Sequence, residues 1–552
     1  MLKSLLQMKN KFTFFVQNIL LSVLGAVFFA LSHPNYFVLK GLPFLAYIAL
    51  VPFFLLVKRV NLKFSFLWGA FSGALSYFIF NFWIIFFHPV AIYIIIAKYS
   101  IMYGILFFIL KIFDSYFPKY CFFYQTLAWS AFEYIGTLGF LGYSYGLIGY
   151  TQWHFPLLIR ASSIFGVWGI SFLIVFFSAC IAAIIFDFFK EKKLLQVYSK
   201  YLMIWLGVFF AFLLYGAFTK IDLAEIEKTR IALVQPNRDP WLGNLEVYRN
   251  NYEELKSLSE KALKNYPDIE LVVWPETAFI PMIRWHYKYT STNNPNSLLV
   301  RELLHFLDNQ KVPFLIGNDE GVLDERFSDN NFDNLEDKKL DYNAALLFIP
   351  NVNVVPPEPQ VYRKIRLVPF TEHFPYQKFF PEVYTYLKEN DTHFWEKGKT
   401  LNLLQFKNLK IGTPICFEDT FGYISRGFSK NGANIIINLT NDAWAQSSVS
   451  QYQHLSMAVF RAAENRIPVL RAASSGQTVF IDQNGKIRKI LPPFTKDVLV
   501  ADVPVLTECP KTVYSYLGDF FGLFCTIALI MILCFIILNK FIKKNRRLNE
   551  KK

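Results

Sequence analysis

Long apolar runs alternate with short polar connections over the first 220 residues of this chain. A helix needs about 20 apolar residues to cross the roughly 30 Å hydrocarbon core of a bilayer. Runs of about that length occupy residues 13–31, 39–57, 64–87, 89–110, 120–148, 160–188, 200–218 and 517–539. The pattern predicts a multi-pass helical bundle with eight membrane spans, interrupted after the seventh span by a large polar segment.

The polar segment has the pattern of a layered α/β domain, in which short apolar runs alternate with stretches of helical spacing. Strands are predicted at residues 230–235, 269–274, 313–318, 344–349, 409–416, 433–439, 467–473 and 478–485, and helices at 244–265, 296–310 and 450–466. Three parts are therefore expected: a seven-span membrane domain at 1–220, a soluble domain at 221–508, and a C-terminal span with a basic tail at 509–552.

Charged side chains indicate how the chain crosses the membrane. They make up 18% of the 552 residues and are concentrated between about 220 and 505. Elsewhere, Lys and Arg gather in alternate connections, at residues 1–11, 58–63, 111–119, 190–193 and 543–547. Because positive residues favour the cytoplasmic side, both termini are predicted to be cytoplasmic and the soluble domain to lie on the opposite face.

The net charge of +14 is explained by this topology and does not indicate a nucleic-acid partner. Nucleic-acid-binding domains gather basic and aromatic residues into a patch, and residues 221–508 contain no such cluster. Residues 324–343 are instead acidic, rich in Asn and poor in apolar side chains. We expect this stretch to be a mobile surface loop.

One of the six cysteines stands apart from the others. Four lie in apolar runs and a fifth lies at the start of the C-terminal part, whereas Cys416 lies well inside the soluble domain. No CxxC pair or Cys/His cluster has the spacing of a metal site, so neither a metal nor another cofactor is expected. Cys416 ends the run IGTPIC and precedes the helix-like stretch FEDTFGYISRGF. A helix N-terminus there would favour a thiolate, although a single buried cysteine is more often inert.

Two further motifs contain ionisable residues, one after a predicted strand and one before an apolar turn. Glu276 lies in VVWPETAF, and Lys364 and Glu372 lie in VYRKIRLVPFTEHFP. Taken singly, each has an ordinary explanation: a carboxylate at a strand end is often a cap, and a lysine in a basic run is usually exposed. Together with Cys416 they form a candidate catalytic set of an acid/base group, a cation and a nucleophile.

The motifs that carry these residues resemble a known family. The patterns WPET, YxKxxLVPFxE, PICFED and NLTNDAW, the last followed by a QHL helix, are similar to the Glu-Lys-Cys signatures of the nitrilase superfamily. Within that superfamily, the LVPF form of the lysine motif and the segments SHPNYFVLKGLPFLAYIALVPF and GVWGISFL resemble the apolipoprotein N-acyltransferase family.

The resemblance implies a nitrilase-like αββα sandwich and a role for each catalytic residue. Glu276 would be the general base for Cys416, which would carry the acyl chain as a thioester. Lys364 and the backbone N–H of Phe417 would stabilise the oxyanion. Glu372 would position Lys364 or the incoming amine, with a purely structural ion pair as the alternative.

Further residues are assigned only by this resemblance. Asn343 and Glu418 match residues that support the site, and Trp241 and Trp444 are tentative lipid or lid contacts. Glu133 lies inside a predicted span, where an ionisable group is costly. Because the arginine that the family pattern places three residues later is Gly136 here, the role of Glu133 is left open.

The function implied is the transfer of an acyl chain from a phospholipid to the N-terminal amine of a diacylated lipoprotein. The partners would be the phospholipid donor, the lipoprotein acceptor and membrane lipids. The enzyme would lie in the bacterial inner membrane with its catalytic domain on the periplasmic side. Two alternatives remain at this point: a membrane-tethered nitrilase-type amidase that uses water, and a transporter or lipid-binding scaffold with a silent domain.

Overall fold

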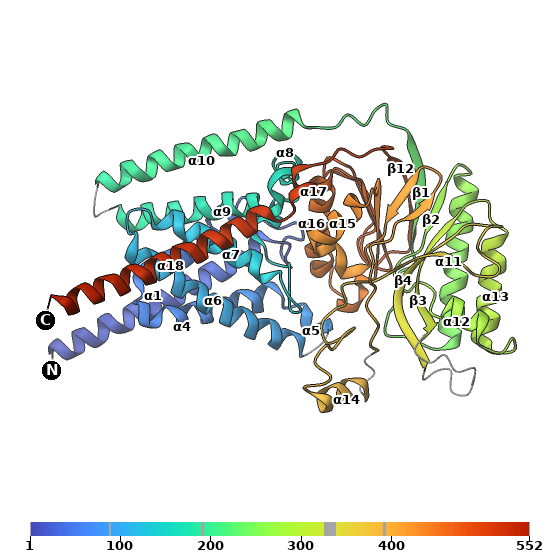
Figure 1. The fold of residues 1–552 in the computed structure, drawn as a ribbon, viewed down its shortest axis with the longest axis horizontal. Helices are drawn as coiled ribbons and strands as arrows, with labels where there is room; N and C mark the ends of the chain where they lie inside the picture. The colour runs from blue at the N-terminus through green and yellow to red at the C-terminus, as the bar shows by residue number, and fades with distance from the viewer. Residues whose placement is uncertain (1, 88–89, 189–191, 325–337, 390–392, 551–552) are drawn as a thin grey trace. The chain divides into compact units, whose positions relative to one another are not determined.

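The structure is a computed structural model that describes residues 2–87, 90–188, 192–324, 338–389 and 393–550. The chain folds as two compact units. The helical unit comprises residues 1–219 and 519–552, and the sandwich unit comprises residues 220–518. Each unit is described separately, and the helices and strands carry the labels of Figure 1.

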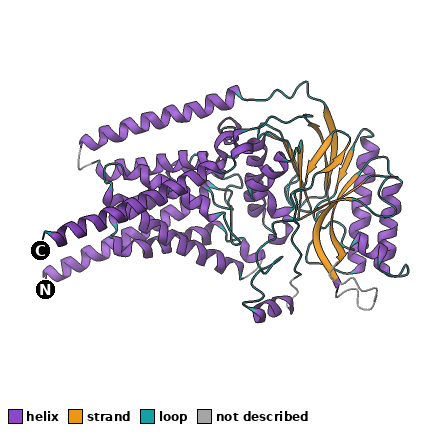
Figure 2. Cartoon of the chain, viewed as in Figure 1, coloured by secondary structure: helices purple, strands orange, loops and turns teal. Residues whose placement is uncertain are grey.

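The helical unit consists of helices joined by turns and by longer irregular segments (Figure 2). Its elements are α1 (Leu2–Ser32), α2 (Ala46–Ala49), α3 (Val51–Arg59), α4 (Leu62–Phe80), α5 (Ile84–Phe87), α6 (Ala91–Tyr116), α7 (Cys121–Gly136), η1 (Ile148–Gln152), α8 (Pro156–Ile159), α9 (Ser162–Asp187), α10 (Lys192–Phe218) and α18 (Phe520–Asn549). Among the described residues, five helical stretches are long and apolar enough to cross a membrane: Lys11–Ser32, Ala91–Tyr116, Ser162–Asp187, Gln196–Phe218 and Phe520–Asn549.

Three of the eight predicted spans are not single long helices. The run 64–87 is α4 as far as Phe80 and then, after a turn, the short α5. The run 39–57 begins with turns and continues as α2 and α3. The run 120–148 is helical only as far as Gly136, after which Gly139 and Gly146 adopt positive φ angles of 73° and 89°. A helix cannot continue through residues in that region of φ/ψ space. The number of spans therefore stays a prediction beyond these five helices.

Glu133 stabilises the irregular segment that follows α7. Its Oε1 accepts a hydrogen bond from the backbone N–H of Ile148 at 3.0 Å, and Ser171 Oγ accepts one from the N–H of Gly149 at 3.0 Å. A chain that leaves helical geometry inside an apolar layer needs such partners for its backbone groups. This contact gives the buried carboxylate a structural role.

The sandwich unit contains two six-stranded sheets with mixed strand directions. The first has the order β12-β1-β2-β3-β4-β5 and the second the order β11-β10-β9-β8-β7-β6. The strands are β1 (Lys228–Gln235), β2 (Leu271–Val273), β3 (Phe314–Leu323), β4 (Lys339–Phe348), β5 (Gln360–Arg363), β6 (Leu404–Phe406), β7 (Leu409–Gly412), β8 (Ile435–Thr440), β9 (Val469–Ala473), β10 (Val479–Ile481), β11 (Ile487–Ile490) and β12 (Asp497–Pro504).

Alternating side chains separate the layers of this unit. Ile231 and Leu233 of β1 belong to an apolar core shared by both sheets, whereas Ala232 and Val234 face the helices outside the first sheet. This period of two is that of a strand buried on both faces. The sheets thus pack face to face, with helices outside each of them (Figure 1).

The outer helices cover the two sheets on opposite sides. On the first sheet lie α11 (Leu245–Asn265) and α13 (Pro295–Asp308), and on the second α15 (Gly422–Lys430) and α16 (Ser448–Asn465). Shorter elements are α12 (Ile283–Lys288), η3 (Cys416–Thr420), α14 (Pro381–Glu389), η4 (Asp442–Ala445) and α17 (Val513–Leu517). The observed order of layers is helix, sheet, sheet, helix.

The structure corrects the predicted strands in two ways. The sequence pattern missed β5, β6, β11 and β12, which are short or lie at or beside a sheet edge. It also assigned residues 324–343 to a loop. Of that stretch, residues 325–337 lie outside the described residues, but Lys339–Asn343 belong to β4, which pairs with β3 in antiparallel register from Leu323↔Lys339 onwards.

Gly317 of β3 marks a close approach of two backbones near Glu276. A Cβ added at Gly317 would lie 2.3 Å from Pro275 O and 2.6 Å from Glu276 Cα. We predict that Gly317→Ala lowers the free energy of unfolding by about 1–3 kcal/mol, the usual cost of overpacking, and displaces Glu276. Thermal unfolding and an activity assay of the detergent-solubilised protein measure both effects.

Gly243→Ala is the matched control, because the nearest atom to its added Cβ is the movable hydroxyl of Tyr248, at 3.2 Å. Equal behaviour of the two variants would contradict the close approach at Gly317.

Candidate active site

Glu276 lies in the turn that follows β2, and three donors reach its carboxylate. Its Oε1 accepts hydrogen bonds from Asn343 Nδ2 at 2.9 Å and Lys364 Nζ at 3.2 Å, and its Oε2 accepts one from the backbone N–H of Asn441 at 3.0 Å. The residue is 4% exposed. A buried carboxylate held by three donors has a fixed position.

Lys364 follows β5 and is completely buried between two carboxylates. Its Nζ lies 3.2 Å from Glu276 Oε1 and 2.8 Å from Glu372 Oε1. Burial alone lowers the pKa of a lysine, but Glu372 and Glu276 outweigh it, so that the pKa of Lys364 lies well above its usual range. Lys364 is therefore an ammonium ion at physiological pH.

Glu372 is held in place by the turn that also carries Lys364. Its Oε2 accepts the backbone N–H of Val368 at 2.9 Å. Burial raises the pKa of Glu372, and the charge of Lys364 opposes this effect. Glu276 from one predicted motif, and Lys364 and Glu372 from another, form one chain of charged groups with the fully buried Lys364 in the middle.

Cys416 stands at the end of the segment that follows β7, in a strained conformation with φ of +50°. Asn438 Nδ2 donates to the carbonyl oxygens of both Pro414 and Cys416, each at 3.1 Å, and so fixes this turn. A non-glycine residue in the left-handed region is uncommon and is typical of functional turns.

The thiol is neutral in the resting structure. Desolvation, followed by repulsion from Glu276, raises the pKa of Cys416 well above its usual value, and Lys364 offsets this only in part. The expectation of a thiolate favoured by a helix N-terminus is therefore wrong. The reason is local: Cys416 begins a five-residue 3-10 turn, η3, and α15 does not begin until Gly422.

Glu418 joins the lysine turn to the cysteine turn. Its carboxylate accepts the hydroxyl of Tyr362 at 2.8 Å, the backbone N–H groups of Ile365 and Arg366 at 2.7 and 2.9 Å, and that of Ile415 at 2.8 Å. Burial raises its pKa to about 6. Its contacts are thus with the backbone that carries Lys364 and Cys416.

The predicted site also includes three aromatic residues. Phe417 lies in the cysteine turn, and Trp241 and Trp444 contact each other. Phe417 packs edge to face on Phe421 with ring centroids 4.9 Å apart, and its carbonyl accepts the Thr420 hydroxyl at 2.8 Å. Trp241 and Trp444, tentatively predicted from distant segments, also meet edge to face at 5.0 Å. Trp241 is 57% exposed, so this pair presents an apolar surface.

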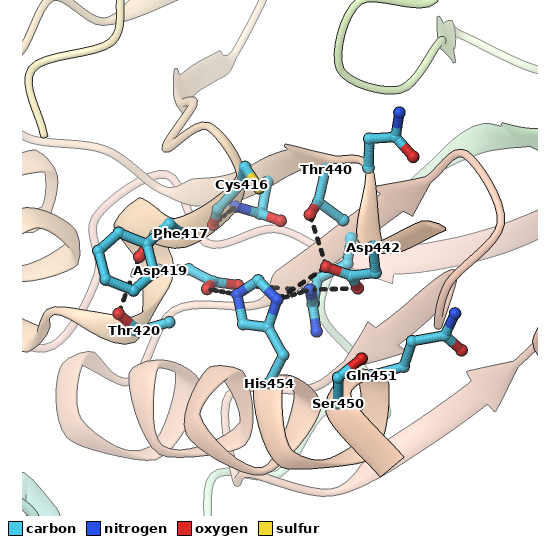
Figure 3. A network of polar contacts seen from close by, with 12 residues as sticks. Cys416, Phe417, Asp419, Thr420, Thr440, Asp442, Ser450, Gln451 and His454 are labelled. Atoms are coloured by element: carbon cyan, nitrogen blue, oxygen red, sulfur yellow. Dashed lines mark hydrogen bonds and ion pairs between the residues drawn. The ribbon is translucent and has the colours of Figure 1, made fainter. Parts of the chain in front are cut away.

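A buried ionic network lies next to the cysteine turn (Figure 3). His454 of α16 is hydrogen-bonded through Nε2 to Asp419 Oδ1 at 2.5 Å and through Nδ1 to Asp442 Oδ1 at 2.8 Å. Arg471 donates to Asp442 Oδ2 at 3.0 Å, and Thr440 donates to Asp442 Oδ1 at 3.0 Å. Asp419 follows Cys416 by three residues, so the network anchors η3 to α16 and β9.

His454 is an imidazolium ion in this network. Burial and Arg471 lower its pKa, but Asp419 and Asp442 outweigh them and raise it to about 9. The same contacts hold the pKa of Asp442 at about 2, against the effect of burial. The sequence analysis noted the motifs NDAW and QHL but assigned no role to Asp442 or His454, which lie in them. Both could have been noticed in the sequence as polar residues within segments that are otherwise predicted to be buried.

No group of three or more His, Cys, Asp or Glu side chains among the described residues is arranged to hold a metal ion. The side chains that are brought together are instead a carboxylate, an ammonium ion and a thiol. A base beside a neutral thiol, with a fixed cation nearby, is suited to acyl transfer through a covalent intermediate.

Comparison with known proteins agrees with this chemistry. A profile of the family described as Carbon-nitrogen hydrolase matches residues 230–509, and one described as Apolipoprotein N-acyltransferase N-terminal domain matches residues 25–180. The chain is 80% identical to Apolipoprotein N-acyltransferase 1 of Treponema denticola, over 98% of this chain and 99% of that protein. It is 44% identical to Apolipoprotein N-acyltransferase 1 of Treponema pallidum, over 93% and 94% of the two chains. For the Apolipoprotein N-acyltransferase of Borreliella burgdorferi, identity is 30% over 91% and 92%.

The sandwich unit, with its buried Glu276 and Lys364 and the partly exposed Cys416, defines a domain of the carbon-nitrogen hydrolase class, attached to the apolar helices of a membrane protein. The three relatives identify a particular family within this class, because they match nearly the whole chain, including the helical unit. The chain belongs to the apolipoprotein N-acyltransferase family.

The imidazolium of His454 makes stability depend on pH. Because its folded pKa of about 9 exceeds the ordinary histidine value of 6.5, its contribution is fully present below pH 6.5 and is lost as pH rises through 9. The shift corresponds to about 3 kcal/mol. We predict that the wild-type melting temperature falls between these pH values and that His454→Gln has a lower, flatter profile.

His305→Gln serves as the control, because His305 is exposed on α13. A His454→Gln profile parallel to that of the wild type would show that the network carries no imidazolium.

Proposed function

We propose that the chain transfers an acyl chain from a phospholipid, through a thioester on Cys416, to the N-terminal amine of diacylglyceryl-cysteine in apolipoproteins. One observation carries the mechanism: the buried Glu276 and Lys364 are hydrogen-bonded to each other and both interact electrostatically with the thiol of Cys416. Membership of the apolipoprotein N-acyltransferase family supplies the two substrates.

In the first half-reaction, the thiol is activated only when it reacts. Glu276 takes the Sγ proton as sulfur attacks the ester carbonyl, and the proton then passes to the alkoxide of the departing lysophospholipid. A positioned base of this kind contributes about 10²–10⁴-fold to the rate. Lys364 and the backbone N–H of Phe417 face the developing oxyanion, and one such donor is worth about 10²–10³-fold.

In the second half-reaction, the acceptor amine attacks the thioester carbonyl. Glu276 takes a proton from nitrogen as the C–N bond forms and returns it to sulfur as the C–S bond breaks. Glu372 keeps Lys364 in place in both steps through its 2.8 Å contact. Asn343 and Glu418 support the site by holding Glu276 and the two turns, and the Trp241–Trp444 pair contacts lipid chains.

Both substrates carry acyl chains that reside in a bilayer, and the apolar helices of the helical unit would place the enzyme in the same membrane. Removing an acyl chain from a bilayer costs about 0.8 kcal/mol per CH₂, so the reaction has to occur beside the lipid. We place the protein in the bacterial inner membrane with eight spans, both termini cytoplasmic and the sandwich unit in the periplasm, as the alternating basic connections suggest.

Labelled phospholipid tests the mechanism directly. We predict that the wild type incubated with a phospholipid carrying a radiolabelled acyl chain acquires a hydroxylamine-sensitive label, and that Cys416→Ser loses the hydroxylamine-sensitive thioester. Cys509→Ser, at the other partly exposed cysteine of the sandwich unit, retains full labelling. A wild type that is never labelled, yet hydrolyses small amides, would establish the amidase instead.

Reporter fusions test the topology. Alkaline phosphatase becomes an active enzyme only in an oxidising compartment, because its fold needs disulfides. We predict an active enzyme when it replaces the chain after residue 225 and an inactive one when it is fused after Lys552. Activity of the fusion at Lys552 would place the C-terminus outside the cytoplasm and contradict the proposed orientation.

A further inference from the structure

Asp319 is a carboxylate beside the active site that the proposed mechanism does not use. It lies on β3 directly opposite Asn343 of β4 in the antiparallel register. Residues opposite each other in such a pair have side chains on the same face of the sheet, with Cβ atoms about 4.5–5.5 Å apart. Since Asn343 reaches Glu276 from that face, Asp319 lies on the same side of the sheet as the general base.

The amide of Asn343 has a free acceptor. An ionised carboxylate can only accept hydrogen bonds, so the nitrogen of the amide must face Glu276 and its oxygen must face away. Asn343 is 2% exposed, and within the described part of the chain nothing donates to its Oδ1. The same holds for Asp319 Oδ1. Buried acceptors normally have a hydrogen-bond partner, so we expect a donor to bind between Asn343 Oδ1 and Asp319 Oδ1.

The charges around Asp319 favour a cationic donor. Burial, then Asp341 and Glu276, raise its pKa to about 7, and Glu372 adds to the same effect. Among the described residues, Arg238 interacts electrostatically with Asp319, and it also donates to Ala278 O at 3.3 Å. Three carboxylates and the guanidinium of Arg238 thus interact with Asp319. Lys364 pairs with two of those carboxylates, Glu276 and Glu372, and Trp395 contributes one hydrogen bond to Asp319, which leaves its Oδ1 unsatisfied among the described residues. An added ammonium ion would relieve the repulsion among the acids and has three N–H donors to offer.

We infer that Asp319 and Asn343 bind the α-ammonium group of the diacylglyceryl-cysteine acceptor, and that Asp319 takes the proton which this group must lose before it attacks. The inference rests on the proposed function and assigns the site for its second substrate. Asp319 is a group that touches the substrate, whereas Glu276 remains the base for the chemical step.

The proton balance of the second half-reaction explains why a second carboxylate is useful. An α-amine has a pKa of about 7.7–8.0 and arrives mostly protonated, while amide formation needs the free amine. The ammonium gives one proton to the Asp319 carboxylate, and the free amine attacks the thioester of Cys416. A second nitrogen proton passes through Glu276 to sulfur as the C–S bond breaks. Asp319 then releases its proton to solvent, so the reaction yields an amide, a thiol and one proton.

One other primary ammonium group could occupy the site. An ethanolamine phospholipid carries it in the head group of the acyl donor, so the same chemistry could serve the first substrate. The two sources differ in the half-reaction that they affect, which allows them to be separated experimentally.

The test measures the two half-reactions of the full-length, detergent-solubilised protein separately. Acylation of Cys416 is followed with donors that bear ethanolamine or glycerol head groups. Transfer is followed from the preformed acyl-enzyme to a synthetic diacylglyceryl-cysteinyl peptide between pH 6 and 9.5. The variant is Asp319→Asn, which keeps the shape of the side chain, and the control is Asp497→Asn at an exposed position of β12.

We expect Asp319→Asn to leave acylation within about twofold of the wild type with both donors, and to slow transfer about tenfold to hundredfold near pH 7, as loss of a charge-assisted hydrogen bond does. The deficit should shrink towards pH 9.5, where the amine is already free. Asp497→Asn should match the wild type throughout.

Other results would overturn the inference. Equal slowing of both half-reactions would make Asp319 a structural residue, and unchanged transfer would remove it from the site. Slower acylation with the ethanolamine donor alone would assign the position to the phospholipid head group. If the wild type forms no acyl-enzyme, the proposed function itself fails, which is a separate outcome.

Discussion

The ion pairs of Lys364 with Glu276 and Glu372 are the interaction on which the site depends. Lys364 is fully buried and lies 3.2 and 2.8 Å from the two carboxylates. Breaking a buried pair by removing one partner costs about 3–5 kcal/mol, so none of the three can be replaced cheaply. This cation allows two acids to stay close to Cys416 while the thiol itself remains neutral.

The two sheets explain how the three residues come together from distant parts of the chain. Glu276 follows β2 and Lys364 follows β5 of one sheet, whereas Cys416 follows β7 of the other. Glu418 ties the last two turns through backbone N–H groups on both sides, and His454 anchors the cysteine turn to α16. A site between packed sheets is fixed before the substrate arrives, and such preorganisation is what electrostatic catalysis requires.

Glu276, Lys364, Glu372 and Cys416 were predicted from short motifs whose combination resembles the nitrilase superfamily. The structure brings Glu276, Lys364 and Glu372 into contact, and their catalytic roles stay predictions. Contacts that depend on how two strands are aligned with each other could not be predicted from the sequence. Asp319 and Asn343 face each other only because β4 starts inside a stretch that reads as a polar loop. The imidazolium of His454 depends on carboxylates from two other segments. The number of spans stays a prediction, because apolarity alone did not reveal that the helix in the run 120–148 ends at Gly136, before Gly139 and Gly146.

The resting charge state of Cys416 tests this description most directly. The rate at which iodoacetamide alkylates Cys416 can be measured from pH 6 to 10 by mass spectrometry of the peptide that carries it. We predict slow alkylation that rises steadily with no plateau below pH 9, because desolvation and, after it, Glu276 raise the pKa of Cys416 and keep the thiol protonated. Fast, pH-independent alkylation at pH 7 would show a resting thiolate, and would contradict the arrangement of charges described for Lys364, Glu276 and Glu372.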